Sequence, residues 1–115
     1  EKIGGVIREA MAQAALGWEA VDAVAATYGP GLASSLLVGL NAAKGLALAL
    51  DKPLIGINHI EAHAYSPFLS TGAPDPAAAL PLLALVVSGG HSCLIDIAAD
   101  GTARVTGQTI DDAAG

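Results

Sequence analysis

The sequence is poor in cysteine, in aromatic residues and in charge, and each shortage excludes something. Cys93 is the single cysteine, so the chain has no internal disulfide and no zinc site built on several cysteines, which fits a reducing compartment. Aromatic residues make up 3% of the 115 residues, so the core has to be built from small and aliphatic side chains. Because 53% of the residues are hydrophobic, a disordered chain is excluded.

The low charge limits what the surface can bind. Charged residues make up 14% of the chain, compared with about 25% in an average soluble domain, so much of the surface is apolar or covered by something else. The net charge is −6, divided into −1 over residues 1–58 and −5 over residues 59–115. A nucleic-acid surface needs clustered Lys and Arg. Any contact with nucleic acid is therefore expected outside these residues.

The most apolar stretch, residues 31–50, is long enough to suggest a membrane span. It contains polar residues, however, and on a helix Ser34, Asn41, Lys44 and Asp51 form one narrow stripe. This pattern predicts a helix buried on nearly every side in a soluble protein. The beginning of the chain lacks the charged and apolar regions of a signal peptide. We expect no membrane contact and a cytoplasmic location.

The first part of the chain reads as alternating helices and strands. Hydrophobic periodicity predicts helices over 1–16, 34–50 and 58–66, and strands over 21–28 and 54–57. This order is typical of an α/β fold with a parallel sheet and right-handed crossovers. The Gly29-Pro30-Gly31 turn leads into the second helix, whose free N–H groups Ser34 or Ser35 is expected to cap. Pro67 should bend or end the third helix, since it has no N–H.

The second part of the chain is predicted to contain consecutive strands instead of alternating helices and strands. Residues 71–81 form a turn-rich connection, and three strands are predicted over 82–88, 92–98 and 103–109. Gly89-Gly90 and Asp100-Gly101 stand where hairpin turns require positive φ, which favours an antiparallel meander. The chain begins within a helix and ends where Asp111 and Asp112 open another. We therefore expect it to be a central slice of a larger protein.

The first candidate site is the segment His59-Ile60-Glu61-Ala62-His63. Two histidines four residues apart on a helix can both ligate one metal ion, although such a pair also occurs on ordinary polar faces. Zinc proteases have the same histidine spacing but place the catalytic Glu directly after the first His. Glu61 is one position later, which argues against that mechanism. No third ligand is evident, and His91 is an unconvincing candidate.

The second candidate site is the segment Val87-Ser88-Gly89-Gly90-His91 between two predicted strands. Paired glycines let main-chain N–H groups approach a phosphate, but a structural hairpin explains them equally well. The Gly29-Pro30-Gly31 turn resembles an anion-binding loop but lacks the lysine of a P-loop. There we favour a packing role, in which Gly31, Gly39 and Gly45 let the helix pack tightly.

Together, in this order, these motifs resemble the bacterial TsaD family. The resemblance rests on the Gly-Pro-Gly turn into residues 36–39, the His59 to His63 block with Pro67, the 87–91 loop and Asp111-Asp112-Ala113-Ala114-Gly115. Members are tRNA threonylcarbamoyladenosine transferases, formerly called O-sialoglycoprotein endopeptidases or glycoproteases. The resemblance implies an actin-like, sugar-kinase-like (ASKHA) α/β fold of two lobes with the nucleotide between them. Residues 1–70 would then end the first lobe, 71–81 connect, and 82–115 open the second.

The resemblance also implies a reaction and its site. The enzyme would transfer a threonylcarbamoyl group from threonylcarbamoyl-AMP to the adenine at position 37 of tRNA, without a protein nucleophile. His59 and His63 match the family's two helix ligands for one iron or zinc ion. The substrate and nucleotide would be held by a segment of five residues, Val86, Val87, Ser88, Gly89 and Gly90. The family's carboxylate ligand lies downstream of the Asp111 motif, outside this chain.

Several alternatives stay open at this stage. A non-catalytic scaffold partner with the same fold would share the Gly-Pro-Gly turn but is not expected to carry the histidine pair. The historical metalloprotease interpretation is disfavoured by Glu61. The 115-residue chain alone is expected to be inactive and to fold alone or associate with copies of itself. For the whole protein, we expect partners from the threonylcarbamoyladenosine pathway and tRNA contacts outside these residues.

Overall fold

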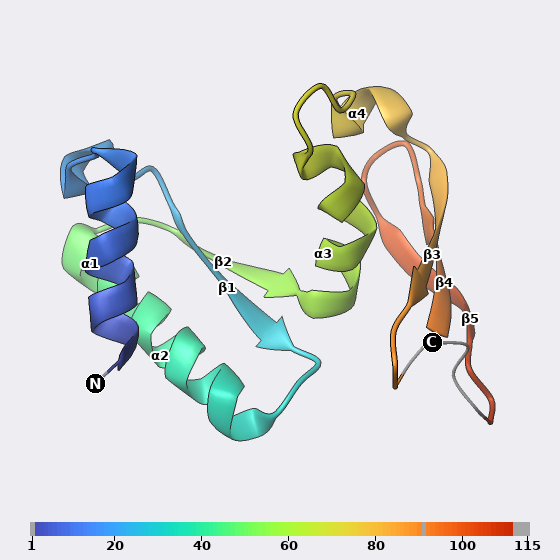
Figure 1. The fold of residues 1–115 in the computed structure, drawn as a ribbon, viewed down its shortest axis with the longest axis horizontal. Helices are drawn as coiled ribbons and strands as arrows, with labels where there is room; N and C mark the ends of the chain where they lie inside the picture. The colour runs from blue at the N-terminus through green and yellow to red at the C-terminus, as the bar shows by residue number, and fades with distance from the viewer. Residues whose placement is uncertain (1, 91, 112–115) are drawn as a thin grey trace. The chain divides into compact units, whose positions relative to one another are not determined.

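Two compact units make up the chain, which we describe from a computed structural model (Figure 1). The structure describes residues 2–90 and 92–111. The first unit is Glu1–His59 and the second is Ile60–Gly115. The division therefore falls at the start of the helix predicted over 58–66, whereas the connection between two parts was predicted at residues 71–81. The assignment of 1–70 and 82–115 to two lobes of a larger protein stays a prediction.

The first unit is a β-α-β arrangement preceded by a helix. Its elements in chain order are α1 (Lys2–Ala14), a 3-10 helix (Trp18–Ala20), β1 (Val24–Gly29), α2 (Ala33–Leu50) and β2 (Leu54–Asn58). Strands β1 and β2 are parallel, with Val24 opposite Leu54, and α2 packs on β1. This confirms the predicted crossover between parallel strands. The sequence did not indicate the 3-10 helix.

The two ends of α2 are built differently from the prediction. Leu32 occupies the N-cap position and makes no side-chain capping bond, so the expectation that Ser34 or Ser35 caps the helix was wrong. The helix begins at Ala33, which places both serines in its first turn, beyond the cap. At the other end Asp51 adopts the left-handed conformation, with φ 52° and ψ 48°. The helix thus ends before Pro53, and its end at Leu50 agrees with the predicted range of 34–50.

Helix α2 is far less buried than the sequence predicted. Only Ala43 and Ala47 are buried, whereas Leu37 is 56% exposed and Leu48 is 84% exposed. Among the described residues, α1 and the two strands are too few to cover an 18-residue helix on all sides. A Cβ at Gly39 would meet nothing within 4 Å, so the tight packing expected there is not made. By length and composition α2 could cross a membrane, and 11% of it is buried.

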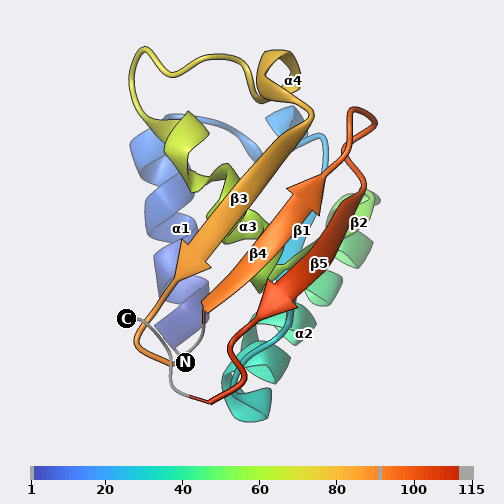
Figure 2. The same cartoon turned by 90° about the vertical axis from the view of Figure 1, so that its right-hand side faces the viewer.

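The second unit combines short helices with a three-stranded sheet (Figure 2). Its elements in chain order are α3 (His59–Tyr65), a 3-10 helix (Ser66–Leu69), α4 (Pro76–Ala79), β3 (Leu82–Val87), β4 (Ser92–Ile97) and β5 (Ala103–Gln108). The strands follow the order β3-β4-β5 and are antiparallel, which confirms the meander. The single turn α4 was not predicted; Asp75 caps it by accepting a 2.9 Å bond from the Ala77 N–H.

The core of the second unit lies between α3 and one face of the sheet. Alternation along β4 sends Cys93, Ile95 and Ile97 inward, where they pack with Ala64 of α3. Ile95 is 1% exposed and Ile97 is fully buried. The core is small and aliphatic, as the shortage of aromatic residues requires. Cys93 is a free, buried residue of this strand.

The two hairpin connections of the meander use different backbone geometry. Gly101 has φ 83°, as predicted, and the preceding Asp100 accepts a 2.9 Å bond from the Thr102 N–H. This main-chain hydrogen bond holds the pKa of Asp100 below its ordinary value of 3.8. Gly89 and Gly90 do not have positive φ, so that prediction was wrong. Strand β3 ends at Val87 and β4 begins at Ser92, and a connection of this length does not need the left-handed turn of a two-residue hairpin.

The stability of the second unit should depend on the inward residues of β4. Replacing Ile97 by Ala removes a fully buried side chain, so we expect the free energy of unfolding to fall by about 2–5 kcal/mol. Leu85→Ala, on a side chain that is 66% exposed, should cost less than about 1 kcal/mol. Urea unfolding followed by circular dichroism measures both. Equal losses for the two variants would contradict this core.

Candidate metal and nucleotide site

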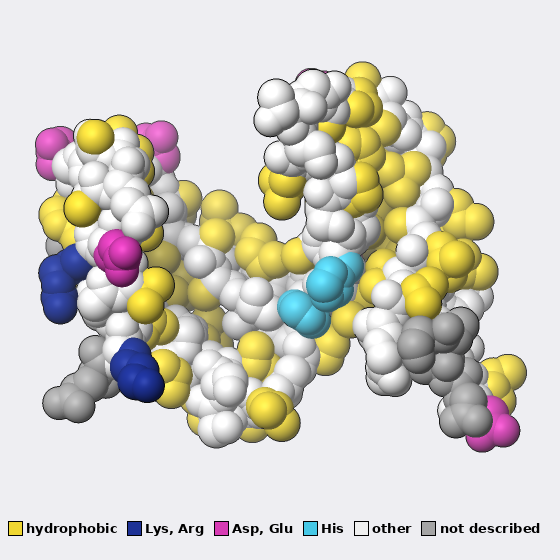
Figure 3. Space-filling model, in the orientation of Figure 1, with side chains coloured by type: hydrophobic (Ala, Val, Ile, Leu, Met, Phe, Trp, Pro, Cys, Tyr) yellow, Lys and Arg dark blue, Asp and Glu magenta, His cyan; other side chains and the backbone are white. Residues whose placement is uncertain are grey.

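Helix α3 carries both candidate metal ligands. His59 is its first residue and His63 lies four residues later, so the two positions are one helical turn apart on one face. Both residues are exposed. Figure 3 shows the two described histidine side chains, in cyan, next to each other on the surface. The structure thus brings together the two residues that the spacing selected.

The residues after His63 shape the end of this helix. Pro67 has no N–H to donate to the His63 carbonyl, and the hydroxyl of Ser66 takes that role with a 2.8 Å bond. The α-helix ends at Tyr65 and continues as a 3-10 helix, which confirms the predicted break. Ser66 is not among the residues predicted from the sequence. A serine directly before the helix-ending proline was the available signal.

The two imidazoles are suitable ligands for a metal ion such as iron or zinc, but two ligands do not complete a site. Imidazole nitrogens suit both iron and zinc. Within residues 2–90 and 92–111, no three His, Cys, Asp or Glu side chains are grouped so that they could hold a metal ion. A metal ion at His59 and His63 therefore needs at least one ligand from elsewhere. The candidate His91, like Asp112, lies outside the described residues.

The predicted phosphate segment begins in β3 and continues into an open loop. Val86 packs against the core, while Val87 is 49% exposed on the opposite side of the strand. Ser88, Gly89 and Gly90 are exposed. A Cβ added at Gly89 or Gly90 would meet nothing within 4 Å. The main chain of the loop is therefore accessible to a ligand, whereas the Val86 side chain has a packing role.

A cavity within the second unit is bordered by one residue of the first candidate site and two of the second. It has a volume of about 530 Å³ and is lined by His63 and Ser66 on one side and by β3 on the other. Val86 and Val87 are among its lining residues. One candidate metal ligand and the first two residues of the predicted phosphate segment thus border the same space.

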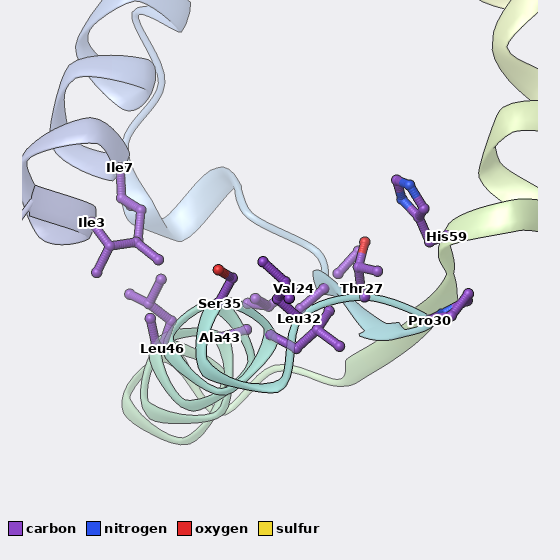
Figure 4. A pocket seen from close by; sticks show the side chains of 16 residues that line it. Ile3, Ile7, Val24, Thr27, Pro30, Leu32, Ser35, Ala43, Leu46 and His59 are labelled. Atoms are coloured by element: carbon purple, nitrogen blue, oxygen red, sulfur yellow. The ribbon is translucent and has the colours of Figure 1, made fainter. Parts of the chain in front are cut away.

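The first unit has its own cavity, shown in Figure 4. Its volume is about 670 Å³, and α1, β1 and α2 supply mainly apolar lining residues. Thr27, Ser35 and His59 are the lining residues with polar side chains. The turn at Pro30 and Gly31 borders this cavity, and none of the described lining residues is a Lys or Arg. An apolar lining argues against anion binding at this turn.

A sequence profile of the TsaD family, described as tRNA N6-adenosine threonylcarbamoyltransferase, matches residues 1–115. The chain belongs to the TsaD family. It is 54% identical over all its 115 residues to the tRNA N6-adenosine threonylcarbamoyltransferase of Symbiobacterium thermophilum, and 50% identical to that of a Nostoc species. It covers 33% and 32% of these relatives. The chain thus spans about a third of the length of the curated TsaD proteins that it matches.

Solved structures show the fold that this TsaD chain shares. YeaZ from Pseudomonas aeruginosa matches with a TM-score of 0.63 at 20% identity, over 94% of this chain and 49% of that one. A second Pseudomonas aeruginosa structure, titled as an uncharacterised protein with similarity to peptidase YEAZ, gives 0.59 at 21% identity over 90% and 46%. The actin-like, sugar-kinase-like α/β fold implied by the resemblance is confirmed.

Proposed function

We propose that the protein containing this chain is a metal-dependent tRNA threonylcarbamoyltransferase. It transfers the threonylcarbamoyl group of threonylcarbamoyl-AMP to the adenine at position 37 of tRNA. Membership of the TsaD family supports the reaction class. The structural observation that supports the location of the site is the cavity bordered by His63, Val86 and Val87. Relatives at 50% identity or more carry the transferase name, which favours a transferase over a scaffold partner.

In this proposal the chain contributes two parts of the active site. The imidazoles of His59 and His63 hold one iron or zinc ion, which supplies Lewis-acid polarisation of the carbamoyl group when bound. The main-chain N–H groups of Ser88, Gly89 and Gly90 hold the phosphate of the adenylate. N–H groups fixed in an exposed loop suit this role because they are already oriented when the ligand arrives.

The transfer itself needs positioning more than a protein nucleophile. The exocyclic amine of adenine forms a bond to the carbamoyl carbon, and the bond from that carbon to the phosphate oxygen breaks. AMP leaves with the electron pair, while the amine loses a proton. The loop stabilises the leaving phosphate, and we assign no covalent catalytic residue to this chain.

The remaining parts of the proposal concern the whole protein. With five Lys and Arg against eleven Asp and Glu, this chain is unsuited to holding tRNA, so the tRNA surface lies in other regions. The protein works in the cytoplasm with protein partners of the same pathway and without a membrane. The 115-residue chain alone is inactive, because a complete set of metal ligands needs residues beyond those described.

The histidine pair is tested in the full-length protein. The double variant His59→Ala, His63→Ala should lose at least about nine-tenths of its bound metal and of its transfer activity, since second-shell changes alone already cost 10–100-fold. Metal analysis and a tRNA transfer assay measure the two quantities. Ala62→Ser, at an exposed position of the same helix, is the control and should keep both. A double variant with full metal content and activity would refute the site.

The loop is tested by Gly89→Ala in the full-length protein. A methyl group at Gly89 would meet none of the described residues within 4 Å and suffers no left-handed backbone, so the melting temperature should not change. The same methyl group would stand where a phosphate meets the main chain, so the Kd for AMP should rise about tenfold or more. Calorimetric titration with AMP measures this. Gly5→Ala, in equally open space on α1, should leave the Kd unchanged, and an unchanged Kd for Gly89→Ala would contradict the assignment.

A further inference from the structure

Thr109, directly after β5, makes an unusual set of contacts with the first residue of β4. Its N–H donates to the Ser92 carbonyl at 2.8 Å. Its hydroxyl donates to the same carbonyl oxygen at 2.9 Å and accepts from the Ser92 N–H at 2.8 Å. One partly buried side chain thus binds both main-chain groups of Ser92.

This contact extends the hydrogen bonding across all three strands at one end of the sheet. The candidate phosphate loop lies at the same end. Val87, the last residue of β3, pairs with Ser92, and Ser92 is bonded to Thr109. The loop of residues 88–91 connects Val87 to Ser92, so both of its ends belong to this hydrogen-bonded end of the sheet. In Figure 2 the end of β3, the start of β4 and the end of β5 lie at the same end of the sheet. Thr109 therefore holds the residue at which the loop re-enters the sheet.

Side-chain packing does not fix the two glycines of the loop. Gly89 and Gly90 carry no side chains, and a Cβ added at either would meet no described atom within 4 Å apart from its chain neighbours. The last residues of a strand pair normally fray, because they have neighbours on one side only. Two additional hydrogen bonds from the Thr109 hydroxyl oppose fraying at Ser92.

We propose that Thr109 is a positioning residue, whose hydroxyl fixes Ser92 and thereby orients the N–H groups of residues 88–90 toward the phosphate of the adenylate. That the loop binds a phosphate rests on the proposed function. That Thr109 holds the loop in place is independent of it.

Thr109→Val in the full-length protein tests the proposal, because valine keeps the shape and removes the hydroxyl. Amide exchange over residues 88–92 should become about tenfold faster, and the Kd for AMP and the KM for threonylcarbamoyl-AMP should each rise about tenfold with little change in kcat. Thr109→Ser keeps the hydroxyl and should restore all three values. If the valine variant does not fold, Thr109→Ala, which also lacks the hydroxyl, takes its place.

Thr106→Val is the matched control. The Thr106 hydroxyl also bonds from β5 to β4, but at 3.4 Å to the Leu94 carbonyl and away from the loop. It should leave exchange at 88–92 and the Kd for AMP unchanged. Unaltered exchange in Thr109→Val would overturn the proposal, as would faster exchange with an unaltered Kd. A wild-type protein that does not bind AMP would sink the proposed function instead, while the exchange measurement would still decide whether Thr109 holds the loop.

Discussion

The packing of α3 against the inward face of β4 is the constraint on which the candidate site depends. Ile60 and Ala64 of α3 belong to the same packed cluster as Ile95 and Ile97. Each follows a histidine by one residue. Because successive residues on a helix are rotated by about 100°, burying Ile60 and Ala64 holds His59 and His63 beside the packed face, where they stay exposed. The sheet that supplies the core also continues into the candidate phosphate loop.

The sequence predicted most elements of this fold because their signals are local. Alternation along β4, the proline after α2 and the break at Pro67 each follow from side-chain type and spacing. The prediction was wrong where neighbours decide the outcome. The burial of α2 depends on how many elements cover it, and the backbone at Gly89 depends on the length of its connection. The turn at Pro76–Ala79 is too short for periodicity to reveal it.

The residues of the candidate site can likewise be separated into those that local sequence patterns reveal and those that depend on long-range contacts. The histidine pair is visible from its spacing of four, and the loop from its two glycines. The role of Ser66 was accessible, since it stands directly before the proline that ends the helix. Thr109 and Ser92 are 17 residues apart, and their contact depends on the register of β4 and β5. No pattern in a single sequence fixes that register.

The most direct test of the account is the position of the metal and the phosphate in one crystal. Anomalous diffraction at the iron and zinc edges, from the full-length protein with AMP bound, locates the metal, and the electron density of the same crystal locates the phosphate. We predict one metal ion bound by the imidazoles of His59 and His63 at roughly 2.0–2.2 Å, and the AMP phosphate against the N–H groups of residues 88–90. A metal ion bound elsewhere, or a phosphate held away from this loop, would contradict the account.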